Sequence, residues 1–215
     1  MDKSQYQAKM ETIKKLIKIG FFASLILGIA SLILFVCFNF MGVLSIKTLD
    51  GTKYQNGFTY PGWQIIYYGV GEMIIQGYTE YTFNIFNFLG FFLPALMMIL
   101  WLFLYLPSYK RKGTNRKKAV LEILSGVLIL FGAVMLFNCD KFAVLNAKNV
   151  KDSYQNYYQM YLVPAINGEL YFKKTFYPTL ILIVGGLTSA VKILNGLLLI
   201  YQKNFAKKNK GANAK

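Results

Sequence analysis

Two ionisable side chains stand inside long apolar stretches of this chain, and they are the residues whose type and position could do chemistry. Glu122 lies in the apolar run 119–138, and Lys192 lies in the run 176–201. A carboxylate and an ammonium in such surroundings can neutralise each other as an ion pair, or they can serve a path for ions or protons. Alternatively, the flexible stem of Lys192 could carry its charge to a polar boundary. These three alternatives stay open at the level of sequence.

Most other chemistries need residue types that this chain lacks. Its 215 residues include no histidine and only two cysteines. This composition excludes histidine-based proton transfer, zinc sites that need histidine, and serine or cysteine nucleophiles activated by histidine. For an enzyme, only Asp140, Glu169 and tyrosine hydroxyls would remain for proton transfer. We therefore expect no enzymatic activity, no metal and no cofactor.

The elements that must position Glu122 and Lys192 follow from composition. The chain is 55% hydrophobic and 15% charged, with a mean hydropathy of +0.40, whereas globular domains are about 45–50% apolar and about 25% charged. A membrane-spanning helix needs about 20 mostly apolar residues. Runs of this kind cover residues 19–44, 85–106, 119–138 and 176–201. The predicted fold class is an all-α membrane protein with a four-helix transmembrane bundle.

The distribution of charge predicts the orientation of these spans. Segments 1–18, 107–118 and 202–215 hold 16 basic and 2 acidic residues, whereas segments 45–84 and 139–175 hold 7 basic and 6 acidic residues. Because short cytoplasmic segments hold the positive excess, we expect a multi-pass plasma-membrane protein with both termini in the cytoplasm. The first apolar run is longer than a signal-peptide core and is expected to stay as an anchor. The basic segments are expected to touch anionic lipid and not to bind nucleic acid.

The two outer segments, 45–84 and 139–175, are too long to be bare connectors. Alternation from Leu44 onward, broken at Asp50-Gly51, predicts a hairpin. The stretch 63–69 reads as a strand or a short interfacial helix, and 146–161 reads as a surface helix. We expect a small mixed α/β extracellular cap built from both loops.

The same loops are rich in aromatic residues, which are favoured both for recognition and for the belt at a membrane interface. A specific binding surface and a belt around a self-packed cap both remain open. The candidate binding residues are Tyr60, Trp63, Tyr67, Tyr68, Tyr157, Tyr158 and Tyr161.

Small residues predict how the spans pack. Gly20, Ser24 and Gly28 recur at a spacing of four in the first span, and the third and fourth spans are also rich in small residues. Because small residues let helices approach closely in lipid, we expect a left-handed bundle whose tightest contacts join spans one, three and four. The second span is bulky all round and is expected on the lipid side or against a partner chain.

The two cysteines, Cys37 and Cys139, lie near the outer ends of their spans. They could form a disulfide if spans one and three are neighbours. Two free thiols at a helix interface are the alternative.

A short outer motif carries a resemblance to a known group. Residues 62–69 read GWQIIYYG, and Phe86-Asn87-Phe88 and Leu93-Pro94 open the second span. This arrangement resembles a group of small uncharacterised four-span proteins of low-GC Gram-positive bacteria and their wall-less relatives. The resemblance implies the architecture and no particular activity. In layout the chain is also loosely similar to claudin-type tetraspans, but it lacks their paired loop cysteines.

These observations favour a non-enzymatic structural, binding or accessory subunit of a membrane assembly. Its expected partners are the lipid bilayer and other membrane subunits or further copies of itself. The alternative is a small transporter or channel component formed by oligomerisation, with a path lined by Lys192, Glu122, Asn195 and Ser189.

Overall fold

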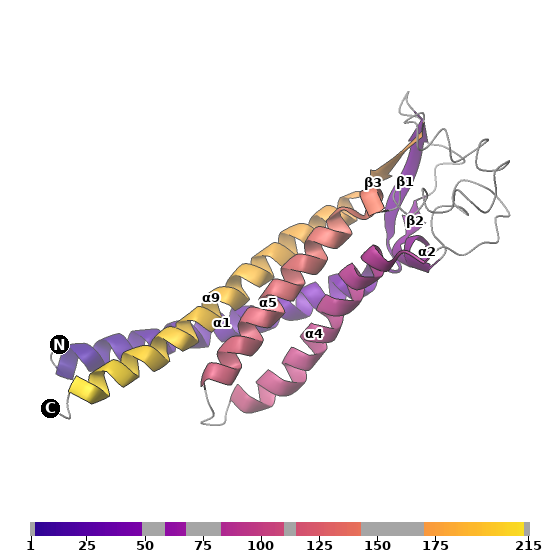
Figure 1. Ribbon diagram of the computed structural model, residues 1–215. Helices are drawn as coiled ribbons and strands as arrows, with labels where there is room; N and C mark the ends of the chain where they lie inside the picture. Colours follow the sequence, from indigo (N-terminus) through magenta and orange to yellow (C-terminus); the bar gives the residue numbers. More distant parts are fainter. Residues whose placement is uncertain (1–2, 49–58, 68–82, 110–114, 143–169, 213–215) are drawn as a thin grey trace. The chain divides into compact units, whose positions relative to one another are not determined.

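The computed structural model describes residues 3–48, 59–67, 83–109, 115–142 and 170–212 (Figure 1). This part of the chain is mostly helical, as predicted, with a small sheet. The helices are α1 (Lys3–Cys37), α2 (Gly62–Tyr67), α4 (Ile85–Tyr109), α5 (Asn115–Phe137) and α9 (Phe176–Ala212), and the strands are β1 (Gly42–Thr48), β2 (Tyr60–Pro61) and β3 (Leu170–Lys174).

Four of these helices are long and apolar enough to cross a membrane, which confirms the four predicted spans. They are Ser4–Cys37, Ile85–Tyr105, Arg116–Phe137 and Phe176–Lys207. Each exceeds the length of about 20 residues that the hydrocarbon core of a bilayer requires. The four apolar helices indicate a multi-pass membrane protein.

The chain divides into two compact units. The first unit comprises residues 1–32, 94–130 and 184–215. In it, parts of α1, α4, α5 and α9 run side by side (Figure 1). Buried positions recur at spacings of four and three, as in Ile17, Phe21, Ser24, Gly28 and Ser31 of α1. A repeat of 3.5 residues is typical of left-handed helix packing.

The basic terminal segments of this unit are helical, which the sequence did not predict. Helix α1 begins at Lys3 and α9 continues to Ala212, whereas the predicted spans began at residue 19 and ended at residue 201. The Tyr6 and Phe205 rings stack with centroids 5.3 Å apart. Ile13, Ile17, Ala119 and Leu199 form a buried cluster beside them. Apolar residues at helical spacing therefore continue both helices into the charged segments.

Helix α4, expected on the lipid side or against a partner chain, has an exposed apolar face and also buries its opposite face within this unit. Met98, Trp101 and Tyr105 are fully buried. Met98 fills the space above Gly28 of α1, where an added Cβ would lie 2.6 Å from the Met98 methyl. Tyr105 stacks on Phe21 of α1 at 5.6 Å. Large side chains of α4 thus occupy the room that small residues of α1 leave, as close packing requires.

The predicted close packing at small residues is confirmed between α5 and α9. A Cβ added at Gly126 of α5 would lie 3.0 Å from the backbone oxygen of Ser189. One added at Gly196 of α9 would lie 3.0 Å from the backbone oxygen of Ala119. These backbones approach so closely that any side chain would push them apart.

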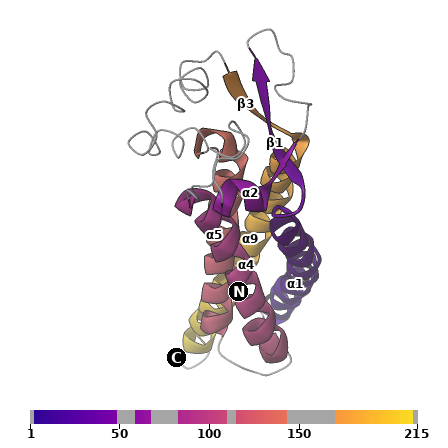
Figure 2. The same cartoon turned by 90° about the vertical axis from the view of Figure 1, so that its right-hand side faces the viewer.

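The second unit comprises residues 33–93 and 131–183 and contains a three-stranded antiparallel sheet with strand order β2-β1-β3. β1 pairs with β3 from Leu44 opposite Lys174 to Thr48 opposite Leu170, and the two strands lie side by side in Figure 2. The predicted strand after Leu44 is therefore present. It pairs over most of its length with β3, which belongs to the second outer segment, 139–175. Of the stretch 63–69, the residues up to Tyr67 are helical, as part of α2, rather than a strand.

Polar side chains form hydrogen bonds with backbone groups at the helix ends of this unit. The Asn84 side-chain oxygen accepts a hydrogen bond from the Asn87 backbone N–H at 3.2 Å, which is an N-cap of α4. Lys174 of β3 donates to the Phe137 backbone oxygen at the end of α5 at 3.0 Å. Its ammonium also lies 3.5 Å from the centroid of the Phe137 ring. The turn at Asp50-Gly51 and the predicted helix 146–161 lie outside the described residues.

Candidate functional site

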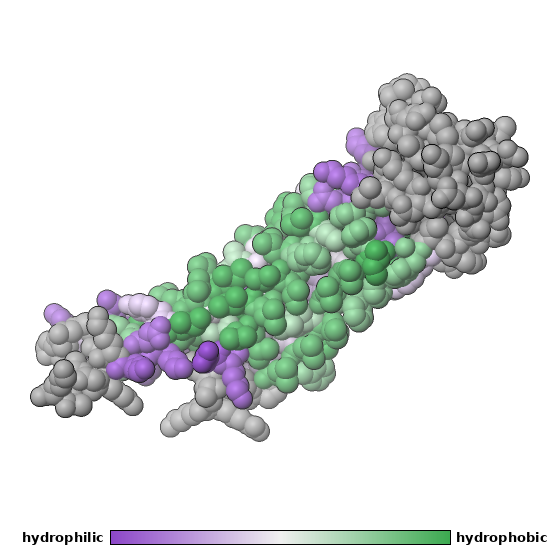
Figure 3. Space-filling view, in the orientation of Figure 1, coloured by the Kyte–Doolittle hydropathy of each residue, from purple (hydrophilic) through white to green (hydrophobic). Residues whose placement is uncertain are grey.

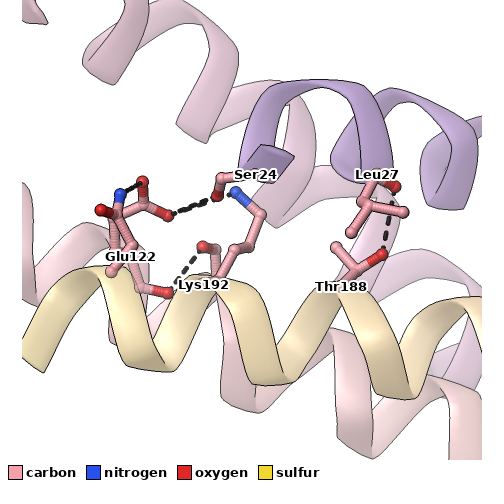
Figure 4. A network of polar contacts seen from close by, with 7 residues as sticks. Ser24, Leu27, Glu122, Thr188 and Lys192 are labelled. Atoms are coloured by element: carbon pink, nitrogen blue, oxygen red, sulfur yellow. Dashed lines mark hydrogen bonds and ion pairs between the residues drawn. The ribbon is translucent and has the colours of Figure 1, made fainter. Parts of the chain in front are cut away.

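The first unit brings polar side chains from three helices together at buried positions (Figure 4). Ser24 comes from α1, Glu122 from α5, and Lys192 and Asn195 from α9. On α9, Thr188, Lys192 and Asn195 are spaced four and three apart, so they share the face that the 3.5-residue repeat buries. The fold therefore points these polar groups inward. We call Ser24, Trp101, Glu122, Lys192 and Asn195 the Glu122 cluster.

Glu122 is the centre of the cluster. Its Oε2 accepts a hydrogen bond from the Ser24 hydroxyl at 3.0 Å and lies 3.4 Å from the Lys192 ammonium. Its Oε1 accepts from the Asn195 side-chain amide at 2.9 Å. Both carboxylate oxygens therefore have donors, and the buried negative charge faces a positive one.

Lys192 has two neighbours that compensate its charge. One is Glu122, and the other is the Trp101 ring of α4, whose centroid lies 3.2 Å from Nζ. A cation held over an aromatic face is stabilised by about 2 kcal/mol when both groups are desolvated. The Glu122 and Lys192 side chains are both 0% exposed. Lys192 therefore lies inside the unit rather than extending to a polar boundary.

A second polar contact lies further along α9. The Ser31 and Thr188 hydroxyls are 2.7 Å apart. The Thr188 hydroxyl also lies within hydrogen-bond distance of the Leu27 and Val184 backbone oxygens, at 3.1 and 2.8 Å. Hydrogen bonds between spans of this kind contribute about 0.6–2 kcal/mol. α1 and α9 are thus joined directly at this level, and through Glu122 of α5 at the level of the cluster.

Glu122 and Lys192 form a buried ion pair in which the two charges cancel. Moving one ion out of water costs several kcal/mol, and the partner charge and hydrogen bonds must offset that penalty. Two polar atoms of the cluster, Asn195 Oδ1 and Trp101 Nε1, are buried without a hydrogen-bond partner among the described residues. The rest of the cluster is internally satisfied.

The structure places only some of the predicted aromatic residues. Tyr60 is half-buried in β2, and Trp63 and Tyr67 are exposed on α2. The Tyr67 ring contacts Phe83 and Phe88, with centroids 6.0 and 6.5 Å away. Tyr67, Phe83 and Phe88 form a partly exposed aromatic group in the second unit. Tyr68, Tyr157, Tyr158 and Tyr161 lie outside the described residues.

The two cysteines are free thiols in the structure, which is the second of the two alternatives that the sequence left open. Cys139 is buried, and Cys37 is half-buried. Burial, with a smaller contribution from the neighbouring Asp140 carboxylate, raises the pKa of the Cys139 thiol to about 12. A thiol with this pKa is a poor nucleophile at neutral pH.

Within the described ranges, no group of three or more cysteine, aspartate or glutamate side chains could hold a metal ion. Comparison of the chain with protein-family models, curated proteins and solved structures finds no match.

Sequence reasoning missed part of the cluster. Trp101 was expected on a helix that lies on the lipid side or against a partner chain, and Ser24 was expected only as a small packing residue. One signal could have found Ser24: Ser24 and Ser31 are seven residues apart on α1, and Thr188 and Asn195 are seven apart on α9. Matching polar positions one heptad apart predict two facing polar layers.

Proposed function

We propose that this protein is a non-enzymatic membrane protein that serves as a structural, binding or accessory subunit of a membrane assembly. The observation that carries the proposal is the complete burial of the ion pair in the Glu122 cluster. Both charges are 0% exposed and lie 3.4 Å apart, so the pair is suited to holding α1 and α5 to α9 rather than to carrying an ion. Contacts with other molecules are left to the outer faces of the helices and to the loops.

The outward face of α4 is the proposed contact surface within the first unit. Large apolar side chains project from it, and Phe103 is 74% exposed. The others in this unit are Leu96, Ile99, Leu100 and Leu104. The proposal includes a plasma-membrane location with cytoplasmic termini, which rests on the distribution of basic residues. It also includes a small extracellular cap made from both long loops, bearing the aromatic binding residues.

Extraction in a mild detergent, followed by native mass measurement and identification of co-purifying chains, tests this function. We expect a mass above 24.5 kDa, from a partner chain or further copies. The variant Leu100→Ala/Phe103→Ala should shift the mass toward that of the single chain. The matched control is Ile26→Ala/Ile29→Ala, which trims two exposed apolar residues of α1. A single chain without companions in the unaltered protein would contradict the proposal.

A small transporter or channel component is the second candidate, with Lys192 and Glu122 in its path. The observation that favours it is the pair of unpartnered buried atoms, Asn195 Oδ1 and Trp101 Nε1, because a passing ion or water could bind them. Lys192→Met distinguishes the two functions. Loss of flux in reconstituted vesicles with assembly and thermal stability unchanged would favour transport.

A further inference from the structure

A groove opens at the start of α5, on a part of the molecule that the proposed function does not use. Its volume is about 530 Å³, and it is lined by Arg116, Lys117, Val120 and Leu121. This volume falls within the range of about 300–1,000 Å³ that is common for small-molecule sites. The groove is therefore large enough for part of a lipid.

The four lining residues are ordered along the helix by polarity. They occupy two successive turns of one helix face, because Lys117, Val120 and Leu121 lie one, four and five residues after Arg116. The two cations lie where the apolar span Arg116–Phe137 begins, and the two apolar residues follow one turn inside it. In Figure 3 hydrophilic residues border the hydrophobic surface of the helices in the first unit. The cations lie at the boundary of the span and the apolar residues lie inside it. A phospholipid has the same order, with a charged headgroup followed by apolar acyl chains.

The surface of the groove is almost entirely apolar, so Arg116 and Lys117 line it with the carbon stems of their side chains, and both residues are accessible. Arg116, Lys117 and Val120 are exposed, and Leu121 is half-buried. No acidic residue lines the groove among the described residues. A guanidinium can hold a phosphate through two parallel hydrogen bonds, and a neighbouring ammonium adds a point charge.

We propose that this groove binds an anionic phospholipid. Arg116 and Lys117 hold the phosphate of the headgroup, and an acyl chain lies on Val120 and Leu121. A free phosphate gains nothing from the two apolar residues, and a neutral amphiphile gains nothing from the two cations. A ligand with both parts uses the two cations and the two apolar residues together.

Native mass spectrometry of the full chain, extracted from vesicles that contain equal amounts of phosphatidylglycerol and phosphatidylcholine, tests the proposal. We expect selective retention of phosphatidylglycerol by the unaltered protein. In Arg116→Gln/Lys117→Gln its affinity should fall about thirtyfold, from roughly a fivefold loss for each cation near an anionic membrane surface. Arg116→Lys should lose less, because one charge is kept.

The matched control is Lys14→Gln/Lys15→Gln, which removes two exposed lysines of α1 and the same net charge. It should retain phosphatidylglycerol almost as well as the unaltered protein. Val120→Trp should fill the groove and lower retention without changing charge. Equal losses in the two charge variants, or equal retention of both lipids, would overturn the proposal. Displacement of the lipid by millimolar glycerol phosphate would identify a site for soluble anions and would also overturn it.

Discussion

The Glu122 cluster sets the stability of the first unit at the level of single residues. Removing one partner of a buried ion pair leaves an uncompensated charge, which is destabilising by about 3–5 kcal/mol. We therefore expect Glu122→Gln and Lys192→Met each to lower the free energy of unfolding by that amount. The double variant Glu122→Gln/Lys192→Met should recover a large part of the loss, because no charge is left unpaired. Thermal unfolding in detergent measures these values.

Trp101 provides a local readout for the same cluster. Its ring lies 3.2 Å from the Lys192 ammonium, so its fluorescence should change in Lys192→Met in a Trp63→Phe background. If the double variant and the single variants had the same free energy of unfolding, the Glu122–Lys192 pair would not hold the unit together. A double-mutant cycle of this kind isolates the pairwise interaction.

The pKa of Cys139 predicts an inert thiol. With a pKa of about 12 in the folded protein, almost no thiolate is present at pH 8. We expect alkylation of Cys139 in a Cys37→Ser variant to be slow in the folded protein and fast after denaturation. Above the ordinary thiol pKa the unfolded chain loses a proton that the folded chain keeps, so stability should fall from that pH up to about pH 12. Rapid alkylation of the folded variant at pH 8 would contradict this.

At the scale of elements, the close contact of α5 and α9 depends on glycine. Gly126→Ala and Gly196→Ala should each lower the free energy of unfolding by about 1–3 kcal/mol, because the added methyl meets backbone of the other helix. Gly186→Ala in α9 is the matched control, because nothing lies within 4 Å of its Cβ position. It should be neutral or stabilising by up to about 1 kcal/mol, since alanine favours a helix over glycine. Thermal unfolding of the three variants is the measurement, and an equal loss in all three would refute close packing.

At the scale of the whole molecule, orientation can be tested with single cysteines. In a Cys37→Ser/Cys139→Ser background, Thr59→Cys lies in an outer loop of the proposed topology and Lys203→Cys lies in its cytoplasmic end. A membrane-impermeant maleimide should label Thr59→Cys in intact cells and Lys203→Cys only after permeabilisation. The reason is the positive charge of the three segments that are assigned to the cytoplasm. The reverse pattern of labelling would invert the topology.

The sequence by itself determined the four membrane-spanning helices, because a span needs only length and apolar composition and does not depend on its neighbours. It also determined the small-residue positions at which α5 and α9 meet, since glycine at those positions permits close approach whatever the detailed packing. Asn84 could be predicted as a cap for the same reason, because capping is local.

Only the tertiary structure decided which side chains face one another. Trp101 was expected on the lipid side or against a partner chain because every side of α4 is bulky, and its place over Lys192 depends on how Gly28 lets α4 approach α1. The pairing of β1 with β3 joins residues more than 120 positions apart, which no local pattern specifies. The charged ends of α1 and α9 fold because each supplies the other with an apolar neighbour, Tyr6 against Phe205. Contacts between distant segments arise from complementary shape and charge, and neither segment displays that complementarity alone.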